Sequence, residues 1–342
     1  MTLSYRTRRG LRYFGIGALI ALLIAIVIWM IWIIWLDRFV VYTRDGAQIN
    51  FDQPPGQFSG EEAIPPVPGE TISIYYNDGD NVVNLTNELT QLKGYYADTE
   101  AIRESVSKVR EQIETLPSGT AVMLDMKNIA GYFHYSTSVG GETSDRVDIE
   151  AMDSLLEYLQ GANLYTIARI PAFRDYHYGL NNVPYGLPLK KGIGLWMDGS
   201  GCYWLNPASD GTLNYLIQII NELKGLGFDE VVFTDFCFPD TDKISFDGDQ
   251  TAVINKAAED LATICTSDSF CVSFTSNDPF FKLPQRRCRL YRTGVAASNV
   301  RNEAAASDVP DTAINLVFVT ETNDTRYDDY GTMRPLDSAH FE

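Results

Sequence analysis

The sequence lacks the residue patterns of several common protein classes. Only three His and five Cys are scattered over 342 residues, without the spacing of a zinc finger or an iron–sulfur site. Basic residues are scarce: 27 Lys and Arg stand against 45 Asp and Glu, a net charge of −18. Such a surface disfavours binding to nucleic acid or to anionic lipid. Gly (26) and Pro (15) are near ordinary usage, which excludes collagen-like and low-complexity chains.

Several catalytic signatures are also missing. The chain has no G-x-S-x-G turn and no H-E-x-x-H pair, which excludes an α/β-hydrolase and the common metalloproteases. No glycine-rich phosphate loop follows an early strand, which weighs against a doubly wound nucleotide-binding fold. We therefore predict no cofactor and no required metal. Asp125, Asp235 and Glu321 would hold a metal only if the fold brings them together.

One long apolar run is present, YFGIGALIALLIAIVIWMIWIIWL at 13–36. A helix of this length extends ~36 Å and spans a ~30 Å hydrocarbon core with some tilt. The alternative, a cleaved signal peptide, has a shorter apolar region that ends at small residues. Here the run ends with Trp29, Trp32 and Trp35, which suit the membrane–water interface. We predict an uncleaved transmembrane helix that contacts the lipid bilayer through 13–36.

The charges beside this run predict its orientation. Four Arg precede it within 1–12, whereas Asp37 and Arg38 nearly cancel after it. The positive-inside rule makes 1–12 a cytoplasmic tail and places the rest outside the cytoplasm. No second run of this length exists, so we predict a single-pass protein of the cell membrane and exclude a channel or transporter.

Residues 37–70 have the composition of a stalk. The segment 39–51 alternates around Asp45-Gly46 and predicts a β-hairpin. The following segment, 53–70, is rich in Pro and Gly and predicts an extended, semi-rigid spacer. We expect another short strand at 71–77.

The remainder, 71–342, alternates between strands and helices and is predicted to be one barrel domain. We expect strands at 93–98, 120–127, 163–173, 229–239, 269–275, 288–296 and 314–321. We expect helices at 99–116, 148–161, 211–227 and 250–265.

Most of these strands are continuous apolar runs, which are typical of a parallel sheet buried on both faces. The span from 93 to 342 has the typical length of about 250 residues for a (β/α)₈ barrel. We therefore predict an α/β fold, a TIM-like (β/α)₈ barrel. The eighth strand is not visible, so the barrel is either incomplete or closed by 71–77.

Acidic residues at strand ends predict where chemistry takes place, because barrel active sites lie at the carboxyl ends of the strands. Asp125 and Asp235 each interrupt a strongly apolar strand, and Glu321 follows the last predicted strand. Carboxylates facing one mouth form an acid/base site. The alternative is that strand ends are polar simply because they meet water.

A loop of about 40 residues, 171–210, is rich in aromatic residues. Tyr176, Trp196 and Trp204 are candidates for stacking on the apolar face of a sugar, on a peptide or on a base. The alternative is that the two Trp residues pack the loop onto the barrel.

The cysteines leave two interpretations open. Cys265 and Cys271 flank a short turn and would be close enough to form a disulfide outside the cytoplasm. The count is odd, however, and Cys237 lies inside a predicted strand, so free thiols are the alternative.

Four blocks in this order resemble one family. They are AVMLDMKNIAGYFHYST (121–137), IARIPAF (167–173), GLWMDGSGCYWLNPAS (194–209) and LGFDEVVFTDFCFP (226–239). Together they resemble the bacterial glycosyl-hydrolase-like TIM-barrel domains, which are often anchored at the cell surface. The resemblance covers roughly residues 90–340 and is densest over 163–239.

The resemblance implies functional positions. Asp125 and Lys127 match the early strand motif, Arg169 matches an Arg after an apolar strand, and Trp196 and Asn206 match the segment before the next helix. The chain departs from some relatives, which carry an acidic residue in place of Thr234 and Arg in place of Cys237. If the essential carboxylate belongs at 234, this chain is inactive.

The main hypothesis is a membrane-anchored glycoside hydrolase acting on cell-wall or surface polysaccharide. Asp235 is the expected acid/base, Glu321 its partner and Asp125 the substitute for either. Lys127 and Arg169 would orient them and bind substrate. An acidic chain attracts anionic glycans only if its mouth is locally basic. The alternatives are a catalytically inactive carbohydrate-binding or scaffolding barrel in envelope assembly, and a barrel enzyme of another kind, such as a deacetylase or a lyase.

Overall fold

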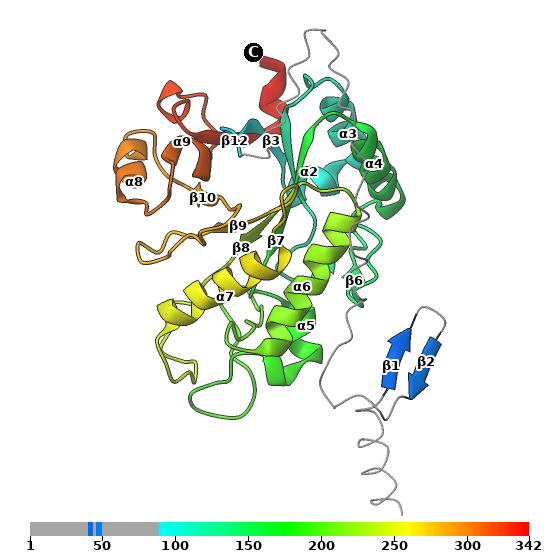
Figure 1. Cartoon of the computed structure of the whole chain (residues 1–342), viewed down its shortest axis with the longest axis vertical. Coiled ribbons are helices and arrows are strands. Elements are labelled where there is room, and N and C mark those ends of the chain that lie inside the picture. Colours follow the sequence, from blue (N-terminus) through cyan, green and yellow to red (C-terminus); the bar gives the residue numbers. More distant parts are fainter. Residues whose placement is uncertain (1–39, 44–45, 50–88, 342) are drawn as a thin grey trace, which may run out of the picture. The chain divides into compact units, whose positions relative to one another are not determined.

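The computed structural model describes residues 40–43, 46–49 and 89–341 (Figure 1). The chain divides into two compact units, residues 1–81 and 82–342, each of which is described by itself. The predicted transmembrane segment at 13–36, the spacer at 53–70 and the predicted strand at 71–77 lie outside the described residues. Within the described part, no helix has the length and apolar character needed to cross a membrane.

The first unit contains the predicted hairpin. Strands β1 (Val40–Thr43) and β2 (Gly46–Ile49) pair antiparallel, with Val40 opposite Ile49 and Thr43 opposite Gly46. The alternating pattern around Asp45-Gly46 therefore identified this hairpin correctly.

The second unit contains a closed barrel of eight parallel strands, in the order of the chain. The strands are β3 (Lys93–Ala97), β4 (Ala121–Asp125), β7 (Tyr165–Pro171), β8 (Glu230–Thr234), β9 (Cys271–Thr275), β10 (Leu290–Thr293), β11 (Leu316–Val319) and β12 (Gly331–Pro335). All seven predicted strands are present, and the expectation of an incomplete barrel was wrong.

Strand β12 closes the barrel by pairing with both β11 and β3. Its sequence, GTMRP, is short and has only one large apolar residue, Met333, so it carries no strand signal of its own. The barrel supplies the missing stabilisation, because Met333 is fully buried inside it.

The larger helices cover the first half of the barrel, where Figure 1 shows α3, α4, α6 and α7 on the outside of the strands. The helices of this half are α2 (Thr99–Glu104), α3 (Val106–Glu114), α4 (Ile149–Gly161), α5 (Tyr176–Asn181), α6 (Asp210–Gly225) and α7 (Gln250–Cys265). The second half has only α8 (Val300–Ala306), α9 (Thr312–Asn315) and the 3₁₀ turns η2 (Thr325–Tyr327) and η3 (Leu336–Phe341). Two short strands, β5 (Tyr132–Phe133) and β6 (Glu142–Thr143), pair in the loop after β4, and η1 (Val183–Tyr185) follows α5.

The single helix predicted at 99–116 is in fact two helices, α2 and α3. Ser105 lies between them in an extended conformation (φ −169°, ψ 111°), and its hydroxyl accepts a hydrogen bond from the amide of Lys108. A Ser side chain that binds the backbone in this way favours a new helix start over a helix interior. The apolar stripe of Ile102, Val106 and Val109 nevertheless stays buried across the break.

Alternation along each strand decides which residues reach the barrel mouth. The interior cluster contains Met123 of β4, Ile167 of β7 and Val232 of β8. Because side chains alternate with a period of two, the next inward positions are Asp125, Arg169 and Thr234. This register places Thr234, and not Asp235, on the inward face of β8.

Candidate active site

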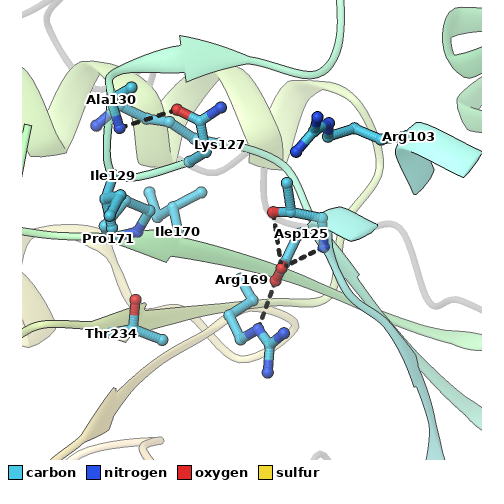
Figure 2. Close-up of a pocket in the computed structure, with 11 residues that line it drawn as sticks. Arg103, Asp125, Lys127, Ile129, Ala130, Arg169, Ile170, Pro171 and Thr234 are labelled. Atoms are coloured by element: carbon cyan, nitrogen blue, oxygen red, sulfur yellow. Dashed lines mark hydrogen bonds and ion pairs between the residues drawn. The ribbon is translucent and has the colours of Figure 1, made fainter. Parts of the chain in front are cut away.

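A cavity of about 460 Å³ opens where β4, β7 and β8 end (Figure 2). Its polar lining residues are Thr99, Arg103, Asp125, Lys127, Asn128, Arg169 and Thr234. Asp125, Lys127 and Arg169, three of the residues singled out from the sequence, therefore meet at one place. We call this cavity the mouth pocket.

Asp125 is fully engaged within the protein. Its Oδ1 lies 2.5 Å from Nε of Arg169, and its Oδ2 accepts hydrogen bonds from the amide of Thr99 at 2.7 Å and from the hydroxyl of Thr99 at 3.0 Å. A carboxylate held by charge-assisted bonds of this kind keeps its position. Asp125 thus fixes Arg169 and the start of α2 at the pocket.

Arg169 forms the floor of the mouth pocket. Burial acts to lower its pKa, but the adjacent charge of Asp125 outweighs burial and the pKa is raised. Its guanidinium lies 5.3 Å from the centre of the Tyr96 ring, a cation–π distance. Arg169 is therefore a permanent positive charge at the centre of the strand ends.

Lys127 forms a buried ion pair that the sequence did not predict. Its Nζ lies 2.5 Å from Oδ2 of Asp175, and both side chains are fully buried. Asp175 also accepts hydrogen bonds from the hydroxyl of Tyr215 at 3.0 Å and from the amide of Tyr178 at 2.8 Å. Burial, then the charge of Asp175, raises the pKa of Tyr215, so this hydroxyl remains a donor. The pair joins β4 to the N-terminus of α5.

Asp235 follows β8 directly and has an unusual backbone. Its φ is +48°, a left-handed conformation that only glycines share among the described residues. Asp235 is not among the residues that line the mouth pocket, whereas its neighbour Thr234 is. Oδ2 accepts a hydrogen bond from the hydroxyl of Thr234 at 3.3 Å, and Oδ1 lies 3.9 Å from Nη1 of Arg174. Backbone strain of this kind is concentrated at functional sites.

The environment of Asp235 favours its protonated form. Burial raises the pKa of this carboxyl, and Arg174, Thr234 and the more distant Lys127 only partly oppose the effect. A half-buried carboxyl with a raised pKa has the property required of a general acid.

Arg174 is positioned by Asp198 of the aromatic loop. Nε of Arg174 lies 2.6 Å from Oδ2 of Asp198, and the same oxygen accepts a hydrogen bond from the indole of Trp204 at 3.0 Å. Burial acts to raise the pKa of Asp198, but hydrogen bonds led by the amide of Cys202 lower it overall. The loop therefore presents a permanent ion pair beside Asp235.

Much of the aromatic loop packs onto the barrel. Trp204 is only 7% exposed, and its backbone pairs with Arg174. Trp196 is half-buried with its ring centre 6.3 Å from that of Trp204, and Tyr176 stacks on Tyr203 at 5.4 Å. Oδ1 of Asn206 accepts a hydrogen bond from the amide of Ala208. Trp204 thus has the contacts expected of the packing alternative, while Tyr176 and Trp196 are half-buried and lie outside the mouth-pocket lining.

Glu321 is exposed and lines a second cavity of about 430 Å³ with Tyr96 and Pro335. Burial, and then the charge of Glu321, raises the pKa of Tyr96. The ring of Tyr96 thus lines the second cavity, and its centre lies 5.3 Å from the guanidinium of Arg169, which lines the mouth pocket. Glu321 therefore belongs to the second cavity, whereas Asp235 lines neither of the two cavities.

Of the two interpretations of the cysteines, the structure has free thiols: none of the five, Cys265 and Cys271 included, forms a disulfide. Burial, then the charges of Asp235 and Asp278, raises the pKa of Cys237 to about 11. This thiol is protonated at neutral pH and is a poor nucleophile. In the described ranges, no group of three or more His, Cys, Asp or Glu side chains is arranged to hold a metal ion.

Sequence reasoning missed Arg103, Arg174, Asp175 and Asp198. The dipeptide Arg174-Asp175 directly follows a predicted strand and was the available signal, whereas Asp198 lies in a Gly-rich turn typical of any surface loop. Their contacts depend on the fold of the loop after β7.

Comparison with known proteins identifies one family model, described as "Putative glycosyl hydrolase domain", which matches residues 95–266. The match runs from β3 to just past α7. No curated protein is significantly similar in sequence to this chain.

Solved structures of similar shape include a hypothetical protein from Ruminiclostridium thermocellum, at 21% identity, with 53% of this chain and 96% of that one covered and a TM-score of 0.45. The exo-β-N-acetylglucosaminidase of Vibrio harveyi is 9% identical, with 67% of this chain and 41% of the enzyme covered and a TM-score of 0.46. Ega3 of Aspergillus fumigatus is 11% identical, with coverages of 76% and 97% and a TM-score of 0.44. This chain thus spans about two fifths of the Vibrio enzyme.

Proposed function

Because the chain belongs to the "Putative glycosyl hydrolase domain" family, we propose that it hydrolyses glycosidic bonds at the mouth of its barrel. The observation that carries this proposal is Asp235, a carboxyl with a raised pKa in a strained backbone at the end of β8. Family membership alone leaves the chemistry open, since one fold hosts many activities.

In the proposed mechanism, protonated Asp235 donates its proton to the glycosidic oxygen as the leaving sugar departs. Glu321 is the second carboxylate, which either attacks the sugar ring or activates a water molecule. The substrate would extend from the mouth pocket across Tyr96 to the second cavity. Arg169 orients the substrate, and Tyr176 and Trp196 offer rings to it. Lys127, which was expected to bind substrate, is fully buried against Asp175 and acts only through its charge. If Glu321 is not the second carboxylate, Asp125 takes that role.

Release of reducing ends from purified cell-wall glycan and a panel of polysaccharides tests this proposal. Glu321→Gln should lower kcat by about 10²-fold or more, because it removes the second carboxylate. Asp308→Asn is the matched control, since Asp308 is an exposed carboxylate of the second half of the barrel and lies outside both cavity linings. Unchanged kcat in Glu321→Gln would exclude Glu321, and Asp125→Asn would then be the next variant to assay.

The second candidate function is a catalytically inactive carbohydrate-binding or scaffolding barrel. The observation that favours it is that Thr234, which ends β8 and lines the mouth pocket, has no carboxylate, whereas the family resemblance implies an acid at this position. In that case no polysaccharide would be hydrolysed, glycan would still bind, and Thr234→Asp would create activity. Hydrolysis by the natural chain would exclude this candidate.

We further propose that 13–36 anchors the chain in the cell membrane, with the barrel outside the cytoplasm. The support is the uncharged apolar run and the Arg residues before it. After alkaline carbonate treatment, the full chain should stay in the membrane pellet and a chain lacking 1–36 should not. Protease added to intact cells should degrade the barrel. Release of the full chain by carbonate, or protection of the barrel, would contradict the anchor or its orientation.

A further inference from the structure

Arg103 is the charged residue of the mouth pocket that has no ion-pair partner among the described residues. It extends from α2 and lines the cavity, as Figure 2 shows. Its side chain is exposed, and no carboxylate in the described part of the chain pairs with it. The other charges of the pocket are paired, Asp125 with Arg169 and Lys127 with Asp175.

Arg169 also retains binding capacity. Only its Nε contacts Asp125, and across residues 89–341 its two terminal nitrogens form no hydrogen bond with the protein. A guanidinium has five N–H donors, so most of those on Arg169 remain available to a ligand.

Asn128 adds a third donor. Its Oδ1 accepts hydrogen bonds from the amides of Ala130 at 3.0 Å and Tyr132 at 3.1 Å. The carbonyl oxygen is thus occupied, and the amide nitrogen of this side chain has no acceptor among the described residues. Asn128 therefore offers only donors to the pocket.

The carboxylate acceptors of the pocket are already used. Both oxygens of Asp125 are engaged by Arg169 and Thr99, so the side-chain acceptors left are the hydroxyl oxygens of Thr99 and Thr234, which donate their protons to Asp125 and Asp235. The pocket thus has free donors, an unpaired positive charge and few free acceptors. Such a site fits a group that only accepts hydrogen bonds and is negatively charged.

We propose that the mouth pocket binds the anionic substituent of a sugar, a carboxylate or a phosphate, through Arg103, Arg169 and Asn128. The inference rests on the proposed function for the glycan part of the ligand. The inference also explains how an acidic chain can bind an anionic glycan. The chain as a whole, at −18, repels anionic glycans, while this pocket is locally basic.

Calorimetric titration of the full chain in detergent tests the inference with two pairs of probes. One pair is tetragalacturonic acid and its methyl ester, and the other is glucose 6-phosphate and glucose. We expect the acid of at least one pair to bind and its neutral partner to bind about tenfold more weakly or not at all. The pair that responds distinguishes carboxylate from phosphate.

Arg103→Gln should raise the Kd of the acid about tenfold and leave the neutral partner unchanged, and Arg103→Lys should restore part of the affinity. Arg301→Gln is the matched control, because Arg301 is an exposed Arg of α8 outside both cavity linings. Arg103 is exposed, so its substitution should leave the thermal unfolding midpoint unchanged, and that measurement excludes misfolding.

The inference would be overturned if neither acid bound, or if each acid bound with the same affinity as its neutral partner. It would also be overturned if Arg103→Gln bound the acid as tightly as the natural chain does. The outcome is separable from the proposed function. Hydrolysis of neutral glycans alone would leave the hydrolase standing without this specificity. Arg103-dependent binding of an acid without any hydrolysis would leave the anion pocket standing without the enzyme.

Discussion

Asp235→Asn should abolish hydrolysis and at the same time raise the free energy of unfolding at neutral pH. Loss of the general acid lowers kcat by about 10²–10⁴-fold. Asn has the same shape and also tolerates the left-handed backbone at φ +48°, so the turn after β8 is preserved. The variant removes a partly buried carboxyl that the folded protein holds in an unfavourable environment.

The pH dependence of the free energy of unfolding follows from the direction in which folding shifts the pKa of Asp235. Because burial raises the pKa of Asp235, the folded state binds this proton more tightly than the unfolded state does. The contribution of Asp235 to stability is therefore full below its unfolded pKa of about 4 and is lost as the pH rises through the higher folded pKa. The advantage of Asp235→Asn should be absent at low pH and should grow across this window, as measured by urea unfolding at a series of pH values.

Asp198→Asn is the matched control, because its effect on the free energy of unfolding at neutral pH should have the opposite sign. Hydrogen bonds lower the pKa of Asp198 despite its burial, so its contribution is present above the unfolded pKa and is lost as the pH falls through the folded pKa. Asp198→Asn should therefore be less stable than the natural chain at neutral pH and converge with it in acid. An Asp235→Asn variant that is destabilised at neutral pH, or that retains full kcat, would contradict the role assigned to Asp235.

Arg289→Met should destabilise the barrel by about 3–5 kcal/mol, the cost of leaving a buried charge without its partner. Nη1 of Arg289 lies 2.5 Å from Oε2 of Glu230, and the two side chains are 2% and 0% exposed. The hydroxyls of Tyr165 at 2.9 Å and Tyr291 at 3.0 Å also donate to Glu230. Removal of the guanidinium leaves this carboxylate inside the barrel with only neutral donors.

Urea unfolding of the single and double variants measures the effect. Glu230→Gln combined with Arg289→Met should recover part of the loss, because it removes the unpaired charge. Arg301→Met is the control for Arg removal at an exposed position and should change stability by less than about 0.5 kcal/mol. If Arg289→Met also lost less than about 0.5 kcal/mol, the pair of Arg289 and Glu230 would contribute little to stability. A double variant less stable than Arg289→Met would contradict the explanation that the unpaired carboxylate of Glu230 causes the loss.

Long apolar runs allowed the first seven strands and the parallel arrangement to be predicted. A run such as AVML at 121–124 is buried on both faces, and only a parallel sheet covered by helices buries a strand in that way. The eighth strand escaped prediction because β12 is held by its two neighbours and one Met side chain rather than by an apolar pattern.

The site was predictable only in part. Asp125 and Arg169 could be identified because a charge inside an apolar strand is exceptional, and they do meet at the mouth pocket. The roles of Lys127 and Trp204 could not be read from the sequence, since both depend on partners in the loop after β7, Asp175 and Asp198.

The sequence by itself determined the strand–helix alternation, the hairpin at 40–49 and the candidate carboxylates, because these depend on residue type and local spacing. Only the tertiary structure decided the closure of the barrel, the free thiols, the inward position of Thr234 and the left-handed turn at Asp235. It also decided that Arg103 lines the same pocket as Arg169 and has no ion-pair partner among the described residues. The physical reason is that pairing, burial and electrostatic shifts depend on residues distant in the chain, which strand register and loop packing bring together.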